Sequence, residues 1–99
     1  MAKGKIKLKK WDIADYLKTQ EDIEGFLEAA IEEGGDDPEY IAHVLGVIAR
    51  AKGMTKIAKE TGLSRATLYK ALAKGGNPEF ATVLKVINAL GIKLQVSSA

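Results

Sequence analysis

The sequence predicts an all-α fold, a bundle of five to six helices that contains a helix-turn-helix. Apolar residues recur at helical spacing through most of the 99 residues. Residues that cap helices precede these segments, and glycines that end helices follow them. Alternation typical of a strand occurs only at residues 92–96, where we expect at most a short C-terminal strand.

The first two predicted helices lie between Trp11 and Gly35. Trp11 opens a short helix, and Thr19 is expected to cap a longer one, because its hydroxyl can accept a free N–H of the first turn. Apolar residues of the short helix are Ile13, Tyr16 and Leu17. Those of the longer helix are Ile23, Phe26, Leu27, Ala30 and Ile31, before Gly34 and Gly35 end it.

Four further helices are predicted after Gly35. Asp37 caps the third helix and Pro38 takes its first position, where a missing N–H costs nothing. Its apolar stripe is Ile41, Val44, Leu45, Ile48 and Ala49, and Gly53 ends it. Shorter helices follow at about 55–61, 65–73 and 78–90, with Thr55, Ser64 and Asn77 as their caps. The core stripe of the last helix is Phe80, Val83, Leu84, Ile87 and Leu90.

The charges divide the chain into three segments, although the net charge is only +2. Residues 1–10 carry five lysines, residues 11–39 carry eleven acids against Lys18, and residues 40–99 carry nine Lys or Arg against two acids. We therefore expect a basic N-terminal arm (1–10), an acidic helical extension (11–36) and a helix-turn-helix DNA-binding domain (37–99). The arm either follows DNA or keeps the chain in solution.

The acidic extension suits a basic partner, because opposite charges steer association. Its candidate contacts are Asp15, Glu21, Asp22, Glu24, Glu28, Glu32 and Glu33. Solubility is the alternative role for these acids. For Trp11 and Tyr16 we expect core packing, with anchoring of a partner as the alternative.

Composition excludes several classes of site. There is no cysteine and His43 is the one histidine, so we expect neither a disulfide nor a structural zinc site. No nucleophile, base and acid are arranged for catalysis, so we expect no enzyme, no metal and no cofactor. No apolar run approaches the roughly 20 residues of a membrane span. We expect a cytoplasmic protein that contacts no membrane.

Residues 55–72 are typical of a helix-turn-helix. Two helices that cross at a short turn need a small residue where they meet and a glycine that leaves the first helix. Ala58 and Gly62 occupy these positions, and Ser64 caps the second helix. Ile57, Leu63, Leu68 and Leu72 are expected to bury the pair.

The outer side of the second helix of this pair suits the major groove of DNA. The candidate base contacts are Arg65, Ala66, Tyr69 and Lys70. An arginine can pair with guanine through two hydrogen bonds, and an alanine can contact a thymine methyl. The candidate phosphate contacts are Lys56, Ser64, Thr67 and Lys74. A purely structural corner is the alternative interpretation.

A homodimer is expected, because a two-fold pair would present two such helices about 34 Å apart, one turn of the duplex. The candidate dimer contacts are Val86, Ile92, Leu94 and Val96.

From Thr55 onward the chain resembles the Cro/phage-repressor type of helix-turn-helix domain. A wider set of blocks between residues 8 and 95 resembles the addiction-module antidote family. These blocks are Trp11 with Asp12, Tyr16 with Leu17, the acidic second helix, and residues 48–55, 61–65, 68–72 and 76–78.

The resemblance implies a HigA-like antitoxin. Such a protein binds a small basic toxin of the HigB/RelE-like, mRNA-cleaving fold and represses its own operon by binding double-stranded operator DNA as a dimer. Independently of the resemblance, an mRNA-cleaving toxin must be basic to hold phosphates, and the acidic extension would complement it. A transcriptional regulator without a toxin partner is the alternative.

Overall fold

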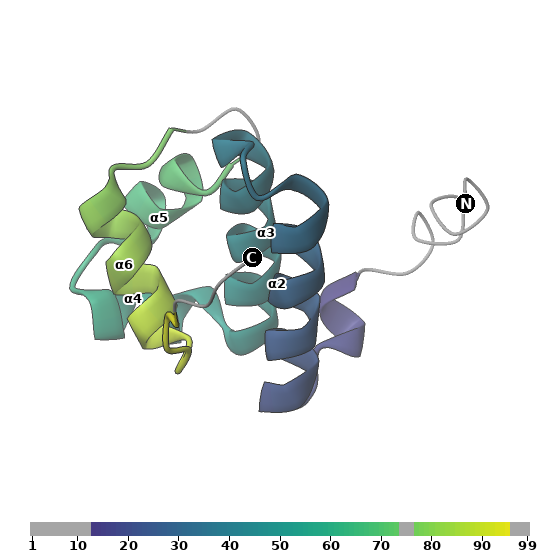
Figure 1. The fold of residues 1–99 in the computed structure, drawn as a ribbon. Coiled ribbons are helices and arrows are strands. Elements are labelled where there is room, and N and C mark those ends of the chain that lie inside the picture. The colour runs from purple at the N-terminus through teal and green to yellow at the C-terminus, as the bar shows by residue number, and fades with distance from the viewer. Residues whose placement is uncertain (1–12, 74–76, 96–99) are drawn as a thin grey trace.

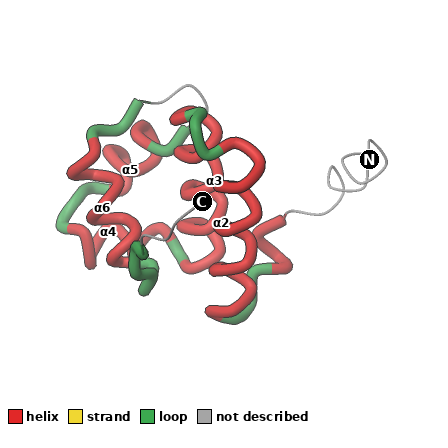
Figure 2. Tube along the Cα trace, viewed as in Figure 1, coloured by secondary structure: helices red, strands yellow, loops and turns green. Residues whose placement is uncertain are grey.

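A computed structural model of the chain describes residues 13–73 and 77–95. Within these two ranges lie a short 3-10 helix, η1 (Ile13–Tyr16), and five α-helices. The α-helices are α2 (Gln20–Gly34), α3 (Pro38–Lys52), α4 (Met54–Thr61), α5 (Arg65–Ala71) and α6 (Phe80–Ala89). The all-α prediction is confirmed. Within the described ranges no residue forms a strand, so the strand expected near the C-terminus is absent from residues 92–95 (Figure 2).

Helix α3 is the central helix of the bundle. Helix α2 packs along one side of α3, while α4 and α6 pack against it from the other, and α5 follows α4 (Figure 1). Helix η1 also packs on α3, so the acidic extension shares the core of the remaining chain.

The predicted caps of α2 and α3 are confirmed. The Thr19 hydroxyl accepts from the Asp22 N–H at 3.0 Å, and the Asp22 carboxylate accepts from the Thr19 N–H at 3.1 Å, which completes a capping box. Hydrogen bonds from the backbone N–H groups of Thr19 and Lys18 lower the pKa of the Asp22 carboxyl from its usual 3.8. Asp37 accepts from the N–H groups of Glu39 and Tyr40.

The predicted caps Thr55 and Asn77 are wrong. Gly53, with a φ of 107°, ends α3 and directly precedes α4, so α4 begins at Met54 without a side-chain cap. Helix α6 begins at Phe80, two residues later than expected, and Glu79 precedes it without a capping hydrogen bond. Neither helix start is marked by a side-chain cap, so a search for capping residues does not detect it.

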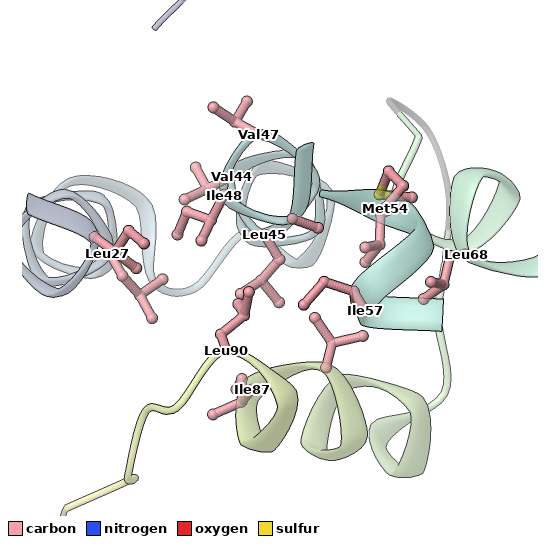
Figure 3. Close-up of a cluster of buried hydrophobic side chains, with 14 of the residues drawn as sticks. Leu27, Val44, Leu45, Val47, Ile48, Met54, Ile57, Leu68, Ile87 and Leu90 are labelled. Carbon is pink, nitrogen blue, oxygen red and sulfur yellow. The ribbon is translucent and has the colours of Figure 1, made fainter. Parts of the chain in front are cut away.

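The core is formed by apolar side chains from all five α-helices. Figure 3 shows Leu27 of α2, Leu45 and Ile48 of α3, Ile57 of α4, Leu68 of α5 and Leu90 after α6 around one interior. The largest fully buried side chains are Leu45, Ile48, Ile57, Leu68, Leu90 and Val86. The expected burial of Ile57, Leu68 and Leu72 is confirmed, and Leu63 is partly buried against the cluster.

The stripe predicted for α6 is confirmed at Val83, Ile87 and Leu90 and wrong at Phe80. Phe80, predicted in the core, is 71% exposed, whereas Val86, predicted at a dimer contact, is fully buried. Because α6 begins at Phe80, its buried side starts one turn later and follows Val83, Val86, Ile87 and Leu90. Val86 is therefore a core residue that a second copy cannot reach. Ile31, expected in the stripe of α2, is also 49% exposed.

A polar cluster joins the ends of three helices. The Lys52 ammonium donates to Gln20 Oε1 at 3.1 Å and to the Leu90 carbonyl at 3.4 Å. The Gln20 amide donates to the carbonyls of Leu90 at 3.0 Å and Gly91 at 3.3 Å. This cluster attaches the start of α2 and the end of α3 to the carbonyl end of α6, where a cation is also favoured by the helix dipole. It fixes where the C-terminal segment leaves the bundle.

Gly46 marks a close approach between α3 and the end of α5. A Cβ at this buried position would lie 2.8 Å from the Leu72 carbonyl oxygen, whereas a Cβ at Gly25 of α2 would meet nothing within 4 Å.

The two glycines should respond oppositely to replacement by alanine. We expect Gly25→Ala to stabilise the protein by about 0.5–1 kcal/mol, because alanine loses less conformational entropy than glycine when a helix forms. Gly46→Ala should instead destabilise it, because overpacking costs about 1–3 kcal/mol. Urea unfolding followed by circular dichroism measures both, and a Gly46→Ala protein at least as stable as Gly25→Ala would refute the close approach.

Candidate nucleic-acid interface

Helices α4 and α5 meet at the short turn formed by residues 62–64. Gly62 adopts the left-handed conformation, with φ 77° and ψ 10°, and its N–H donates to the Ala58 carbonyl at 2.9 Å. An L-residue with a side chain is strained in this conformation, by roughly 1–2 kcal/mol. The Leu63 N–H donates to the Thr61 hydroxyl at 3.2 Å, and this second hydrogen bond also stabilises the turn. The chain therefore leaves α4 where the sequence predicted.

Ser64 begins α5 as a side-chain cap. The Ser64 hydroxyl accepts a hydrogen bond from the Thr67 N–H at 3.0 Å. It forms a second hydrogen bond with the Thr67 hydroxyl at 2.8 Å. Both residues are exposed. Each of these hydroxyls can donate or accept, so either can turn to donate to an acceptor in solution.

Helix α5 has one buried and one exposed side. Leu68 is fully buried, and Leu72 directly after the helix is buried as well. The opposite side presents Arg65, Ala66, Tyr69 and Lys70 to solvent. These four residues form what we call the α5 face, and Lys56 is exposed on the preceding helix, α4. Lys74, the remaining predicted phosphate contact, lies outside the described residues.

Arg65 and Tyr69 contact each other on the α5 face. The guanidinium carbon of Arg65 lies 5.7 Å from the centroid of the Tyr69 ring, which is within the range of a cation–π interaction. Tyr69 is 45% exposed, so part of its ring is accessible from solvent. No carboxylate in the described ranges forms an ion pair with Arg65 or Lys70. Both positive charges are therefore available to an anionic partner.

The predicted acidic contacts are all exposed: Asp15, Glu21, Asp22, Glu24, Glu28, Glu32 and Glu33. Glu33 accepts from the Tyr40 hydroxyl at 3.2 Å. Desolvation is the main cause that raises the pKa of Tyr40, and the hydrogen bond to Glu33 and the Glu33 charge raise it further.

The two aromatic residues of the acidic extension were expected to pack in the core. Tyr16 is 54% exposed, so this expectation is wrong for Tyr16, while Trp11 lies outside the described residues.

Two of the remaining dimer candidates are described. Ile92 is partly buried against the core, whereas Leu94 is 57% exposed. Val96 lies outside the described residues. The sequence did not reveal that residues 92–95 lie beside α2 and form a groove with it. The sequence did contain one signal for the α2 wall of this groove, the repeat of Glu24, Glu28 and Glu32, because residues four apart lie on the same side of a helix.

Neither a metal site nor a membrane span has a candidate among the described residues. Among residues 13–73 and 77–95 no three His, Asp or Glu side chains are grouped so that they could hold a metal ion. None of the helices in this part is long and apolar enough to cross a bilayer.

Comparison with known sequences identifies the family. Residues 7–98 match the family described as probable addiction module antidote protein. The chain belongs to this antidote family. An uncharacterized protein of Haemophilus influenzae is 46% identical over 92 residues, which cover 93% of each chain. No solved structure gives a significant match. Membership in the antidote family supports a role as an antitoxin and therefore a toxin partner of some kind.

Proposed function

We propose that the protein is the antitoxin of a toxin–antitoxin module. In this proposal it binds and neutralises a toxin of the HigB/RelE-like fold, and it represses its own operon through sequence-specific DNA binding. The observation that carries the DNA-binding part is the α5 face, whose exposed basic and aromatic residues lie on a helix held by one buried leucine. The antidote family supports the toxin-binding part.

The buried and exposed sides of α5 support DNA binding. Helices α4 and α5 act as a helix-turn-helix of the Cro/phage-repressor type, and α5 enters the major groove. Arg65 contacts guanine, Ala66 a thymine methyl, and Tyr69 and Lys70 the neighbouring base edges. Lys56, Ser64, Thr67 and Lys74 contact phosphates and set the orientation on the duplex. Two copies bind two half-sites, so the repressor is a homodimer.

Toxin binding is assigned to the acidic extension. A toxin that cleaves mRNA carries positive charge to hold phosphates, and the exposed carboxylates of η1 and α2 attract that charge. The encounter takes place in the cytoplasm, where mRNA is translated. Because the acids lie on η1 and α2 and the α5 face lies on α5, toxin and DNA have separate surfaces in this proposal. The protein catalyses no reaction in this proposal and needs no cofactor.

Co-expression with the product of the adjacent gene tests this proposal. Expression of that product alone should arrest growth, and expression of this chain in addition should restore it. The α5-face double variant Arg65→Ala/Lys70→Ala should still restore growth while losing repression of a reporter that is driven by the module's own promoter. If the wild-type chain represses the reporter and the adjacent product is harmless or absent, the chain is a regulator without a toxin partner.

A further inference from the structure

A groove runs between α2 and the chain that follows α6. Its volume is about 470 Å³. Its walls are formed by Glu24, Leu27, Glu28, Ile31, Glu32 and residues 92–95. The polar cluster of Gln20 and Lys52 holds the carbonyls of Leu90 and Gly91 beside the start of α2, so the second wall is attached where it leaves the bundle.

The groove combines an apolar floor with an acidic rim. Leu27 is buried at its base, while Ile31 and Leu94 are about half exposed, although large aliphatic side chains usually avoid water. Glu24, Glu28 and Glu32 follow one another at four-residue steps, so they form a line of about 12 Å along α2. None of the three carboxylates has an ion-pair partner among the described residues. Lys93 is the one cationic residue in the lining.

We infer that this groove is the docking site for a basic amphipathic segment of the toxin. The inference rests on the proposed antitoxin function and states which part of the acidic extension makes the contact. The partner segment would place aliphatic or aromatic side chains over Ile31 and Leu94, and Lys or Arg side chains along the three glutamates. Apolar anchors at the centre with charged pairs at the rim are the usual organisation of a specific interface.

The acidic rim argues against a second copy of the chain as the occupant. A two-fold pair through this groove would bring the same surface together from both copies. The line of glutamates of one copy would then approach that of the other, and like charges brought together oppose association. A basic segment meets no such repulsion.

Two matched pairs of variants test the inference with the purified product of the adjacent gene as the probe. The rim variant is Glu24→Gln/Glu28→Gln/Glu32→Gln, and its control removes the same charge outside the groove and outside the predicted toxin contacts, Asp36→Asn/Glu39→Gln/Glu60→Gln. The floor variant is Leu94→Ala, and its control is Phe80→Ala, an exposed apolar residue that does not line the groove. All of these residues are exposed, so each variant should remain folded, which thermal unfolding verifies.

Calorimetric titration should show that the rim and floor variants each bind about tenfold more weakly or worse, while the controls stay within about threefold of wild type. The affinity of the rim variant should also depend less on salt. If the wild-type chain binds and the rim variant matches its control, the groove is not the docking site, although the antitoxin function stands. If the wild-type chain does not bind, the proposed function fails and the inference fails with it. If Leu94→Ala instead separates a dimer in sedimentation and leaves toxin binding unchanged, the groove belongs to a second copy.

Discussion

Replacing Leu68 with alanine should lower the free energy of unfolding by about 2–5 kcal/mol, the usual cost of truncating a fully buried leucine. Leu68 is fully buried, and it is the buried residue within α5 itself. A helix of seven residues is too short to be stable in water on its own, so its position depends on this side chain and on Leu72 behind it. Much of the stability of a small domain would be lost, since the total is only about 5–15 kcal/mol.

Tyr69→Ala is the control for this prediction. It removes a larger side chain from the next position, but Tyr69 faces solvent and contacts Arg65, so the loss should stay within about 1 kcal/mol. Urea unfolding followed by circular dichroism gives both values. Equal stability of Leu68→Ala and Tyr69→Ala would mean that α5 is not anchored through Leu68.

Arg65→Ala should weaken specific binding to the promoter by about 1–3 kcal/mol and relax the preference at one base position. The guanidinium of Arg65 stands on the exposed side of α5 with no carboxylate of the described ranges paired to it, so it is free to make two hydrogen bonds to guanine. Its contact with Tyr69 restricts the guanidinium, which reduces the entropy lost on binding. Fluorescence anisotropy with the promoter duplex and single-base variants of it measures affinity and preference together.

Lys70→Ala distinguishes a base contact from a phosphate contact. If Lys70 contacts a phosphate, the variant should bind all duplexes more weakly and its salt dependence should fall by about one unit in slope. If Lys70 contacts a base edge, the loss should be confined to the cognate duplex. Unchanged binding in both Arg65→Ala and Lys70→Ala would mean that α5 does not contact the DNA.

Local signals in the sequence predicted much of the fold. Thr19, Asp37 and Ser64 cap their helices as expected, because a cap is decided by a few neighbouring residues. Gly62 takes its left-handed conformation for the same reason. The exposed side of α5 was equally accessible to prediction, since a single buried stripe through Leu68 determines which residues face outward.

Features that depend on distant parts of the chain were not predictable in this way. Which residues of α6 are buried depends on its packing against α3 and α4. Phe80 was therefore predicted in the core although it is exposed, and Val86 was predicted at the surface although it is buried. The groove joins α2 to residues about 65 positions later, and its second wall is attached through the hydrogen bonds of Gln20. No local pattern contains such contacts. The glutamates of α2 could be counted in the sequence, but their apolar neighbour Leu94 could not be placed beside them.

A footprint on the DNA upstream of the chain's own coding sequence tests the central claim most directly. The account predicts that the wild-type protein protects two half-sites about one helical turn apart, and that Arg65→Ala/Lys70→Ala abolishes this protection while remaining folded. Protection of the same bases by the double variant at the same concentration would contradict the assignment of α5 as the helix that contacts DNA.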